Sequence, residues 1–478
     1  MEQFDTALIG GGPVGYIAAI RCAQLGKKTA LIENRDLGGT CLNRGCIPTK
    51  ALLHTAELYS EIKNHGKDMG LLAEGIGFDY AALAARKDAV ISRLRRGIEA
   101  LVKGRKITLI RGSAAFSGPR TLRVSGTEPE TALNGGEITI EAANIIIASG
   151  SEPASIPVPG ADLPVVLNSD AVLSLTRAPE SAVIIGGGVI GIEFATLLNS
   201  LGKKVTIIEM LPQILNGMDQ SICEGMTKIL TRRGVEIHTA AKLLEIAQGS
   251  GTKTGAICAY EEGGAKKEAS GEIVIMAVGR RPVSKTLNLA AAGIAENRGF
   301  ITVDERLATN VPGIYAIGDV TGKVQLAHVA SAQGLVAAAA IAAGADVHKA
   351  PKMDYGIIPA CVYTSPEIAA VGKTETQVKE AGLPYKTGIF PAAGNGRSLI
   401  MNSTEGFVKI ITHAETGEIL GAHIMASRAT DLIGEIALAM KAEATVEELA
   451  DTIHAHPTVN EMIMEAAHDV EGLCCHKV

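Results

Sequence analysis

The sequence has no tryptophan and few aromatic residues of any kind. Aromatic residues make up 3% of the 478 residues. Proteins that bind nucleic acid use aromatic rings to stack on bases and clustered Lys and Arg to contact phosphates. Here 45 Lys and Arg are outnumbered by 51 Asp and Glu, for a formal net charge of −6, and they form no basic block. These absences argue against a nucleic-acid partner.

Cysteines and long apolar runs are also scarce. The 8 cysteines are too scattered in 478 residues for the disulfide scaffold of a small secreted protein. The first residues are acidic and lead directly into an apolar strand, which is not the form of a signal peptide. The longest apolar stretch, residues 335–345, is too short to cross a bilayer. We therefore expect a cytoplasmic protein that makes no contact with a membrane.

Length and composition predict several folded domains. At about 150 residues per domain, the chain has room for roughly three. Hydrophobic residues make up 47% and charged residues 20%, which excludes a disordered or fibrous chain. Glycine is in excess, with 54 residues and no Gly-X-Y period. The extra glycines are therefore expected at particular backbone positions.

The first group of glycines follows an apolar strand at residues 4–9. A Gly-x-Gly-x-x-Gly turn, an amphipathic helix to residue 25 and a second strand ending in an acid come next. This is the order of a dinucleotide-binding unit, in which the glycines allow a tight turn, close approach to a pyrophosphate and packing of helix on strand. The helix N-terminus supplies N–H groups for the phosphates. The predicted cofactor-binding residues are Gly10, Gly12, Gly15 and Glu33.

The same unit occurs again, and each motif residue lies 176 residues after its counterpart. The second set is Gly186, Gly188, Gly191 and Glu209. Two units with merely structural glycines are the alternative, but the repeat of four motif positions and of the helix exit Leu-Gly-Lys-Lys favours two bound dinucleotides. A carboxylate at Glu209 accepts a hydrogen bond from a free 2′-hydroxyl and repels a 2′-phosphate. The second site is therefore predicted to prefer NAD over NADP.

Two cysteines, Cys41 and Cys46, lie between these units in the segment GGTCLNRGCIPTK. An apolar helix begins after them, and a helix N-terminus favours the thiolate form of a nearby cysteine, with Arg44 expected to help. Two thiols at this spacing can interconvert between dithiol and disulfide. Zinc binding is disfavoured because no second Cys or Cys/His pair stands nearby at ligand spacing. Two buried, inert cysteines are the remaining alternative.

The segment GGTCLNRGCIPTKALLH, set between two dinucleotide units, resembles the class I pyridine nucleotide-disulfide oxidoreductases, and dihydrolipoamide dehydrogenases most of all. The resemblance runs from residue 4 to about residue 472. It implies FAD at the first site and NAD at the second. It also implies a Cys41–Cys46 disulfide in which Cys46 faces the flavin and Cys41 exchanges with substrate. The other cofactor-binding residues that it implies are Lys50 and Glu193 as a pair beside the flavin ring, with Ala114, Gly279, Gly318, Asp319 and Ala327.

A second chemical cluster is the segment IHAHPTVNE near the C-terminus. Histidine has a pKa suited to proton transfer near neutral pH, and a carboxylate can orient its ring. Spacing alone leaves open whether His454, His456 or neither is catalytic. The family resemblance implies that His456 is the base and Glu461 its partner. It also implies a homodimer, with this pair supplied by the other subunit.

The C-terminal tail, with Cys474 next to Cys475, departs from the dihydrolipoamide dehydrogenase pattern. Mercuric reductases and large thioredoxin reductases also carry C-terminal cysteine pairs. The former are expected to lack the His456–Glu461 pair, and the latter to use NADP, against Glu209. We therefore interpret the tail as incidental or accessory, and the four remaining cysteines as structural: Cys22, Cys223, Cys258 and Cys361.

The expected fold is α/β, with two Rossmann-like dinucleotide-binding domains and a C-terminal α+β dimerisation domain. We expect an FAD-binding domain at residues 1–150 and 279–349, an NAD-binding domain at 151–278 and the dimerisation domain at 350–478. No metal site is predicted.

The function that the resemblance implies is oxidation of dihydrolipoamide by NAD⁺ through FAD. The partner would be a lipoyl-bearing protein of a 2-oxoacid dehydrogenase or glycine cleavage complex. One alternative is a mercuric-ion or other disulfide reductase that uses NAD(P)H and the cysteine tail. Another is a non-catalytic nucleotide-binding subunit.

Overall fold

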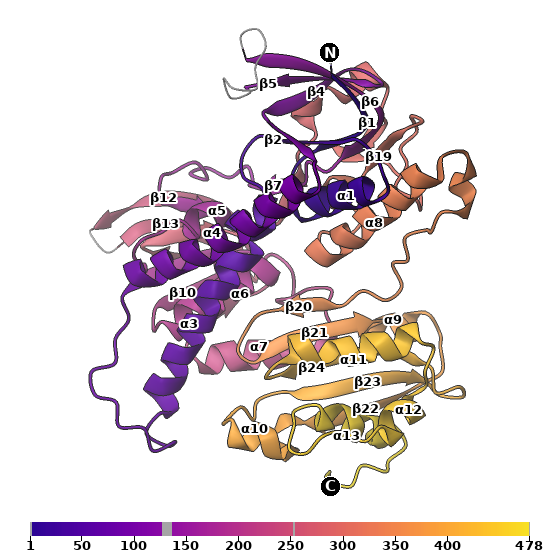
Figure 1. The fold of residues 1–478 in the computed structure, drawn as a ribbon. Coiled ribbons are helices and arrows are strands. Elements are labelled where there is room, and N and C mark those ends of the chain that lie inside the picture. Colours follow the sequence, from indigo (N-terminus) through magenta and orange to yellow (C-terminus); the bar gives the residue numbers. More distant parts are fainter. Residues whose placement is uncertain (1, 127–135, 252–253, 478) are drawn as a thin grey trace.

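The computed structural model describes residues 2–126, 136–251 and 254–477. Three sheets organise the chain: a mixed seven-stranded sheet, a parallel five-stranded sheet and an antiparallel five-stranded sheet near the C-terminus (Figure 1). Small antiparallel sheets link or extend them. This confirms the predicted α/β class with a C-terminal α+β part.

The first sheet has the strand order β3-β2-β1-β6-β5-β4, with β19 also paired to β6. All five residues of β2 are buried, as expected for a parallel strand that is covered on both faces. Because β19 pairs in parallel with β6, the chain returns to its first sheet after the whole second unit. The elements of this part are β1 (Glu2–Ile9), α1 (Pro13–Gln24), β2 (Thr29–Glu33), α2 (Gly39–Arg44), α3 (Cys46–His65), α4 (Tyr80–Gly104), β3 (Thr108–Arg111), β4 (Ser113–Gly118), β5 (Thr121–Ser125), β6 (Glu137–Ile147), β17 (Glu296–Asn297), β18 (Phe300–Ile301), β19 (Ile314–Ala316) and α8 (Ala327–Ala343).

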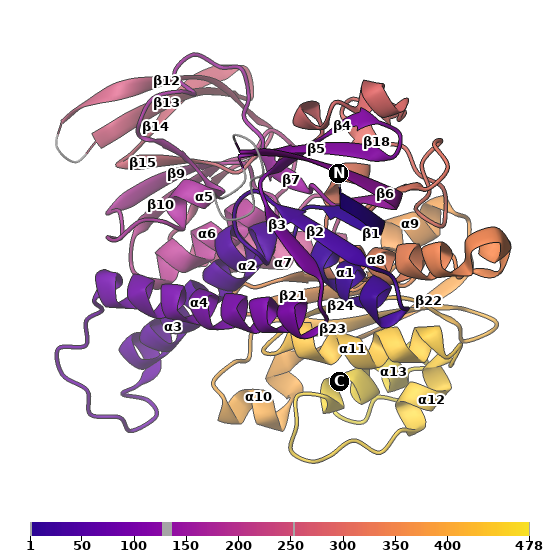
Figure 2. The ribbon, with the colours of Figure 1, turned by 45° about the horizontal axis from the view of Figure 1, so that its top comes forward.

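The second sheet has the order β11-β10-β9-β15-β8 and repeats the strand–turn–helix–strand unit as β9, α6 and β10. A three-stranded antiparallel sheet, β12-β13-β14, lies at its side (Figure 2). The elements are β7 (Ser151–Pro153), β8 (Val166–Asn168), α5 (Ser169–Val172), β9 (Ser181–Ile185), α6 (Val189–Ser200), β10 (Lys204–Ile208), α7 (Gln220–Arg232), β11 (Glu236–His238), β12 (Ala241–Gly251), β13 (Thr254–Glu262), β14 (Ala265–Gly271), β15 (Ile273–Met276) and β16 (Arg280–Pro282).

The C-terminal sheet has the order β20-β21-β24-β23-β22 and carries α11, α12 and α13 (Figure 1). All eight residues of β24 are buried because this strand lies at the centre of the sheet. The elements are β20 (Ala360–Val362), β21 (Glu367–Gly372), α9 (Glu375–Glu380), β22 (Tyr385–Pro391), α10 (Gly396–Ile400), β23 (Phe407–His413), β24 (Ile419–Ala426), α11 (Ala429–Lys441), α12 (Val446–Asp451) and α13 (Glu461–Val470).

The helix α8 is longer than the apolar run at residues 335–345 suggested. With the turn that follows, it spans Ala327–Lys349 and is long and apolar enough, by length and composition, to cross a membrane. It packs instead against α1: a Cβ placed on Gly334 would lie 3.1 Å from the carbonyl oxygen of Val14. Its Gln333 is fully buried and is bonded to the backbone of Gly318. The helix therefore belongs to the core of the first part.

Candidate active site

The first glycine turn is closed by backbone contacts that leave no room for side chains. Gly10 has φ +104°, and a Cβ there would collide with the carbonyl oxygen of Ala148. A Cβ on Gly15 would collide with the carbonyl oxygen of Gly10, so α1 lies directly on the turn. Gly12 precedes Pro13 as the N-cap of α1, and no side chain caps the first N–H groups of the helix. This is the anion-binding geometry that the motif predicts.

The two motif acids make the same hydrogen bonds in the two units. Glu33 accepts from the N–H groups of Gly11 and Arg35, both at 2.7 Å. Glu209 accepts from the N–H groups of Gly187 and Leu211. Each carboxylate therefore lies against its own glycine turn, and its remaining lone pairs can accept from ribose hydroxyls. The internal repeat found in the sequence is thus also a repeat of hydrogen bonds.

A second glycine loop faces the first turn and completes a cradle. A Cβ on Gly39 would lie 2.6 Å from the Cα of Gly12, so only bare backbone fits between them. Asn43 holds this loop by donating to the carbonyl oxygens of Leu37 (3.0 Å) and Gly39 (2.9 Å). Four buried polar atoms around the two loops have no hydrogen-bond partner among the described residues: Asn43 Oδ1, Arg44 Nε, Ser149 Oγ and Asp170 Oδ1. A side-chain-free cradle with unsatisfied polar atoms fits a pyrophosphate-containing cofactor such as FAD.

The two cysteines of the redox segment lie at a helix start and contact each other. Cys46 is the first residue of the 20-residue helix α3, and Cys41 lies in the short helix α2. A hydrogen bond from Cys41 lowers the pKa of Cys46 to about 7; burial opposes this shift, and Lys50 supports it. The same hydrogen bond, together with burial, raises the pKa of Cys41. The pair is therefore polarised, with Cys46 as the thiolate and Cys41 as the thiol.

Arg44 does not have the role that the sequence suggested. Its guanidinium is paired with Asp36 at 2.9 Å and lies 3.8 Å from Asp170. The cation that acts on both cysteines is Lys50, one turn into α3. The expectation that Arg44 stabilises the thiolate was therefore wrong, because its guanidinium is paired with the carboxylates of Asp36 and Asp170.

Lys50 and Glu193 meet although they are 143 residues apart. The Lys50 ammonium lies 2.8 Å from both carboxylate oxygens of Glu193, whose side chain is 5% exposed. Tyr363 completes the cluster, since its N–H donates to Glu193 and its ring lies 4.5 Å from the ammonium. The cluster joins α3, α6 and the segment after β20, close to the thiols.

Asp319 lies in a network that sequence reasoning missed. The hydroxyl of Ser151 donates to its carboxylate, and Arg280 Nε donates to the same hydroxyl at 2.7 Å. Gly318 has φ +76°, and its N–H donates to Gln333 at 2.6 Å. Ser151 and Arg280 lie on the paired strands β7 and β16, so no local pattern could have revealed them.

The structure also places three other predicted cofactor-binding residues. Ala327 begins α8, Ala114 is buried in β4, and Gly279 has φ +104° shortly after β15. The structure places them without testing a cofactor contact, so their roles stay predictions.

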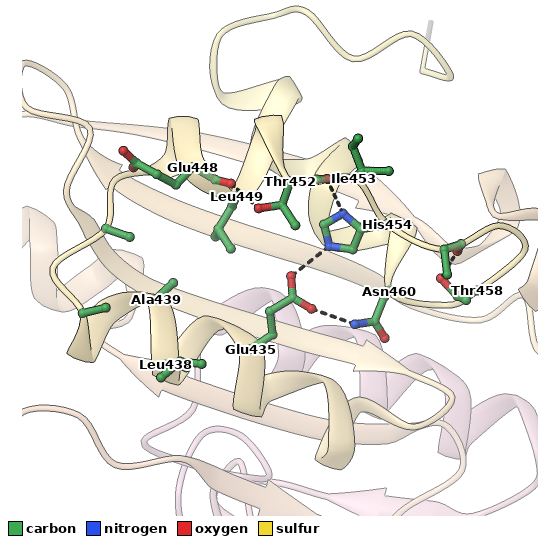
Figure 3. A pocket seen from close by; sticks show the side chains of 13 residues that line it. Glu435, Leu438, Ala439, Glu448, Leu449, Thr452, Ile453, His454, Thr458 and Asn460 are labelled. Carbon is green, nitrogen blue, oxygen red and sulfur yellow. Dashed lines mark hydrogen bonds and ion pairs between the residues drawn. The ribbon is translucent and has the colours of Figure 1, made fainter.

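The structure separates the two histidines that spacing left open. His456 is 79% exposed, and its Nδ1 lies 2.8 Å from Glu461. Burial acts to raise the pKa of Glu461, but the N–H of Thr458 and the imidazole of His456 outweigh it and hold that pKa below its usual value. His454 is 4% exposed and pairs instead with Glu435 at 2.8 Å (Figure 3). Only His456 is open to a substrate.

Within one chain, the structure does not bring His456 to the described thiols. The histidine precedes α13 in the C-terminal part, whereas Cys41 lies in α2, and Figure 2 draws α13 and α2 in different parts of the molecule.

The two C-terminal cysteines differ in their surroundings. The thiol of Cys474 donates to Glu465 at 3.0 Å, and Nδ1 of His476 lies 2.6 Å from the same carboxylate. Burial and Glu465 raise the pKa of Cys474 to about 11, so it is protonated at neutral pH. Cys475 is exposed. Within the described ranges, no group of three or more His, Cys, Asp or Glu side chains is arranged to hold a metal ion.

Sequence comparison identifies the class to which this fold and site belong. Residues 4–334 match the family described as pyridine nucleotide-disulphide oxidoreductase, and residues 358–467 match the dimerisation domain of the same family. The chain belongs to this family. Its relatives use FAD and NAD as cofactors, and its C-terminal domain is a dimerisation domain, which indicates a homodimer.

Individual proteins of this family are similar to the chain over most of its length. The dihydrolipoyl dehydrogenase of Geobacillus stearothermophilus is 41% identical over 477 residues, covering 99% of this chain and 97% of the relative. That of Chlamydia muridarum is 41% identical over 442 residues, covering 91% and 90%. Among solved structures, the HOCl-induced flavoprotein disulfide reductase RclA from Escherichia coli is 30% identical and superposes with a TM-score of 0.84 over 97% of this chain and 99% of RclA.

Proposed function

We propose that this protein oxidises dihydrolipoamide, carried on a lipoyl-bearing protein, to lipoamide with NAD⁺ as the acceptor. The observation that carries the proposal is the exposed His456 imidazole held by Glu461, in a chain that also has the polarised Cys41–Cys46 pair. A dithiol substrate needs a base before it can attack a disulfide. The 41% identity to enzymes named dihydrolipoyl dehydrogenase supports the same substrate.

The thiol chemistry follows from the unequal cysteines. His456 takes a proton from one thiol of the substrate, and the resulting thiolate attacks the sulfur of Cys41 in the Cys41–Cys46 disulfide. The S–S bond breaks, and Cys46 leaves as a thiolate, which its pKa of about 7 favours. The second substrate thiol loses its proton and attacks the mixed disulfide at the substrate sulfur, which closes the lipoamide ring and releases Cys41, which takes up a proton. The substrate is oxidised by two electrons, and the cysteine pair is reduced by two.

The cofactors would be held by the residues of the two turns and the clusters beside the thiols. FAD, when bound, supplies the two-electron acceptor that links the cysteine dithiol to NAD⁺. We assign to it Gly10, Gly12, Gly15, Glu33, Lys50, Ala114, Glu193, Gly318, Asp319 and Ala327, and to NAD Gly186, Gly188, Gly191, Glu209 and Gly279. The domain boundaries that we assign are 1–150 and 279–349 for FAD, 151–278 for NAD and 350–478 for dimerisation. The return of β19 to the first sheet supports the split FAD domain.

The subunit and cellular arrangement is part of the proposal. His456 and Glu461 would act on the thiols of the other subunit, because α13, which begins at Glu461, and α2, which contains Cys41, lie in different parts of the chain (Figure 2). The lipoyl-bearing protein would belong to a 2-oxoacid dehydrogenase or glycine cleavage complex. The 8 cysteines are too scattered for a disulfide scaffold, which suits a reducing compartment, so the cytoplasm is the proposed location.

The alternative reductase that uses the cysteine tail is not favoured. With a pKa of about 11, Cys474 is not a nucleophile at neutral pH. A non-catalytic subunit is disfavoured by the intact cysteine pair and His456–Glu461 pair.

Steady-state turnover of the flavin-loaded dimer tests the proposal. We expect NADH to form from NAD⁺ and dihydrolipoamide, and the rate to stay within about twofold in the double variant Cys474→Ser/Cys475→Ser, since a protonated thiol does not take part in exchange. NADPH with mercuric ion is the comparison reaction. Reduction of mercuric ion without oxidation of dihydrolipoamide would overturn the proposal, and so would loss of lipoamide turnover in the double variant.

A further inference from the structure

A second carboxylate–histidine pair flanks the proposed base. Glu435 on α11 accepts a hydrogen bond from His454 Nε2 at 2.8 Å and another from Asn460 Nδ2 at 2.7 Å (Figure 3). His454 comes two residues before His456, and Asn460 comes immediately before Glu461. One carboxylate therefore holds both ends of residues 454–460, which we call the histidine loop.

Both ring nitrogens of His454 face hydrogen-bond acceptors. Nδ1 lies 2.8 Å from the carbonyl oxygen of Thr452, and Nε2 lies 2.8 Å from the carboxylate of Glu435. A carbonyl and a carboxylate only accept hydrogen bonds, so both bonds form together only when the imidazole is protonated. The groups that face it are acidic or neutral: Glu435 from α11, Glu461 from α13 and the Thr452 carbonyl that follows α12. Both nitrogens of the His454 ring are thus directed at acceptors, and one of these is the Glu435 carboxylate that also holds Asn460.

Apolar packing on this side of the loop is sparse, so hydrogen bonds hold it in place. A cavity of about 590 Å³ lies between α11, α12 and the loop. Ile453, next to His454, is 97% exposed, and Leu438 on the facing side of the cavity is 70% exposed. The later part of the loop is also held by Asn395, which donates to the Thr458 carbonyl, and by the buried side chain of Val459. Glu435 is the side chain that bonds to His454 at the start of the loop.

We propose that Glu435 and His454 are positioning residues that fix the histidine loop from both ends and so set the place of the His456 imidazole. This inference rests on the proposed function of His456 as the base. Neither residue touches substrate: both act through the loop. A base that must reach thiols of another subunit depends on such fixation, because a misplacement of about 1 Å costs up to ~100-fold in rate.

The variant Glu435→Gln, measured as the flavin-loaded dimer, tests whether Glu435 holds the histidine loop in place. A glutamine has a single acceptor oxygen and an NH₂ group that donates, so it cannot accept from both His454 and Asn460. We expect kcat with dihydrolipoamide to fall about tenfold or more, within the range that a positioned base contributes, with a smaller change in KM. Reduction of ferricyanide by NADH, which needs no thiol base, should be unchanged. Glu447→Gln, an exposed acid on α12, is the matched control and should leave both rates unchanged.

Amide hydrogen exchange of a peptide covering residues 452–462 gives a readout that does not depend on turnover. Relative to the intrinsic exchange rates, we expect faster exchange in Glu435→Gln and in His454→Gln at neutral pH.

Several outcomes would contradict the proposal that Glu435 and His454 position the histidine loop. They are equal losses of lipoamide and ferricyanide turnover in Glu435→Gln, unchanged exchange in the histidine loop, and a variant that elutes as a monomer on gel filtration, which would assign Glu435 to assembly. If the wild type fails to oxidise dihydrolipoamide, the proposed function is wrong, while the exchange measurement still decides whether Glu435 and His454 fix the loop.

Discussion

The acidity of Cys46 depends on a few neighbours at the residue scale. Cys46 is the first residue of α3, and it accepts a hydrogen bond from the Cys41 thiol. The Lys50 ammonium also favours the thiolate, while burial and Glu193 oppose ionisation. The resulting pKa of about 7 makes Cys46 both a thiolate and a good leaving group at neutral pH. Its partner Cys41 stays protonated, so the order of thiol exchange is built into the pair.

Lys50→Met should raise the pKa of Cys46. Removing the cation withdraws a charge that favours the thiolate and leaves the Glu193 carboxylate uncompensated, and both effects act in the same direction. The rate of alkylation of the reduced enzyme by iodoacetamide, measured against pH, should show its midpoint move above pH 7. Lys63→Met, on an exposed turn of the same helix, is the control and should leave the midpoint in place. A midpoint that stays put or falls in Lys50→Met would contradict this account.

At the scale of elements, each glycine turn is a junction between a helix and the backbone of its own sheet. Gly15 in α1 lies on the carbonyl of Gly10, and Gly191 in α6 lies on the carbonyl of Gly186 in the same way. The close approach aims the N-terminus of each helix at its nucleotide site. Because it depends on the absence of a Cβ, any side chain must push the helix away.

Gly15→Ala should destabilise the protein and weaken flavin binding. The new methyl group would run into the Gly10 carbonyl, and overpacking of this kind costs about 1–3 kcal/mol. The check is the free energy of unfolding in urea, together with the flavin content of the purified protein. Gly97→Ala is the matched control, because Gly97 lies within α4 and a Cβ there meets nothing within 4 Å. That control should stabilise the protein by up to about 1 kcal/mol. Equal effects of the two variants would refute the steric argument.

At the scale of the whole molecule, a buried ion cluster joins the second part to the C-terminal sheet. Asp219 caps the N-terminus of α7 and lies 2.8 Å from the ammonium of Lys409 on β23, which is 3% exposed. Lys409 also pairs with Glu375 of α9 at 2.7 Å, and His423 of β24 lies 3.9 Å from Asp219. Lys379 and Lys409 hold the pKa of Glu375 at about 2. The cluster fixes how the dinucleotide part sits on the dimerisation domain.

Lys409→Met should destabilise this junction by about 3–5 kcal/mol at neutral pH, because it leaves Asp219 buried without its cation. Lys379→Met, which removes an exposed partner of Glu375, should cost no more than about 1 kcal/mol. The contribution of Glu375 is present above its unfolded pKa of about 4.3 and is lost as the pH falls toward its folded pKa of about 2. Urea unfolding at several pH values should therefore show the gap between wild type and Lys409→Met narrowing in that acidic range. A gap that widens on acidification would contradict the assignment.

Local rules account for what the sequence by itself determined. The strand–glycine–helix order, the acid that ends each second strand and the cysteine pair at a helix start are all visible in short segments, because backbone conformation and helix dipoles act over a few residues. The repeat at 176 residues then made two nucleotide sites and the α/β class predictable. The family resemblance supplied the Lys50–Glu193 and His456–Glu461 pairings, which the structure brings within hydrogen-bond distance.

Tertiary structure alone decided which charges meet and which side chains reach solvent. The sequence predicted that Arg44 stabilises the thiolate, but in the fold its guanidinium lies beside Asp36 and Asp170. Ser151 and Arg280 meet Asp319 only through paired strands, and Glu435 reaches His454 only because α11 packs beside the histidine loop. Packing buries the side chain of His454 and leaves that of His456 exposed. Such contacts join residues far apart in the chain, and their energies depend on distance and desolvation, which only the packed fold defines.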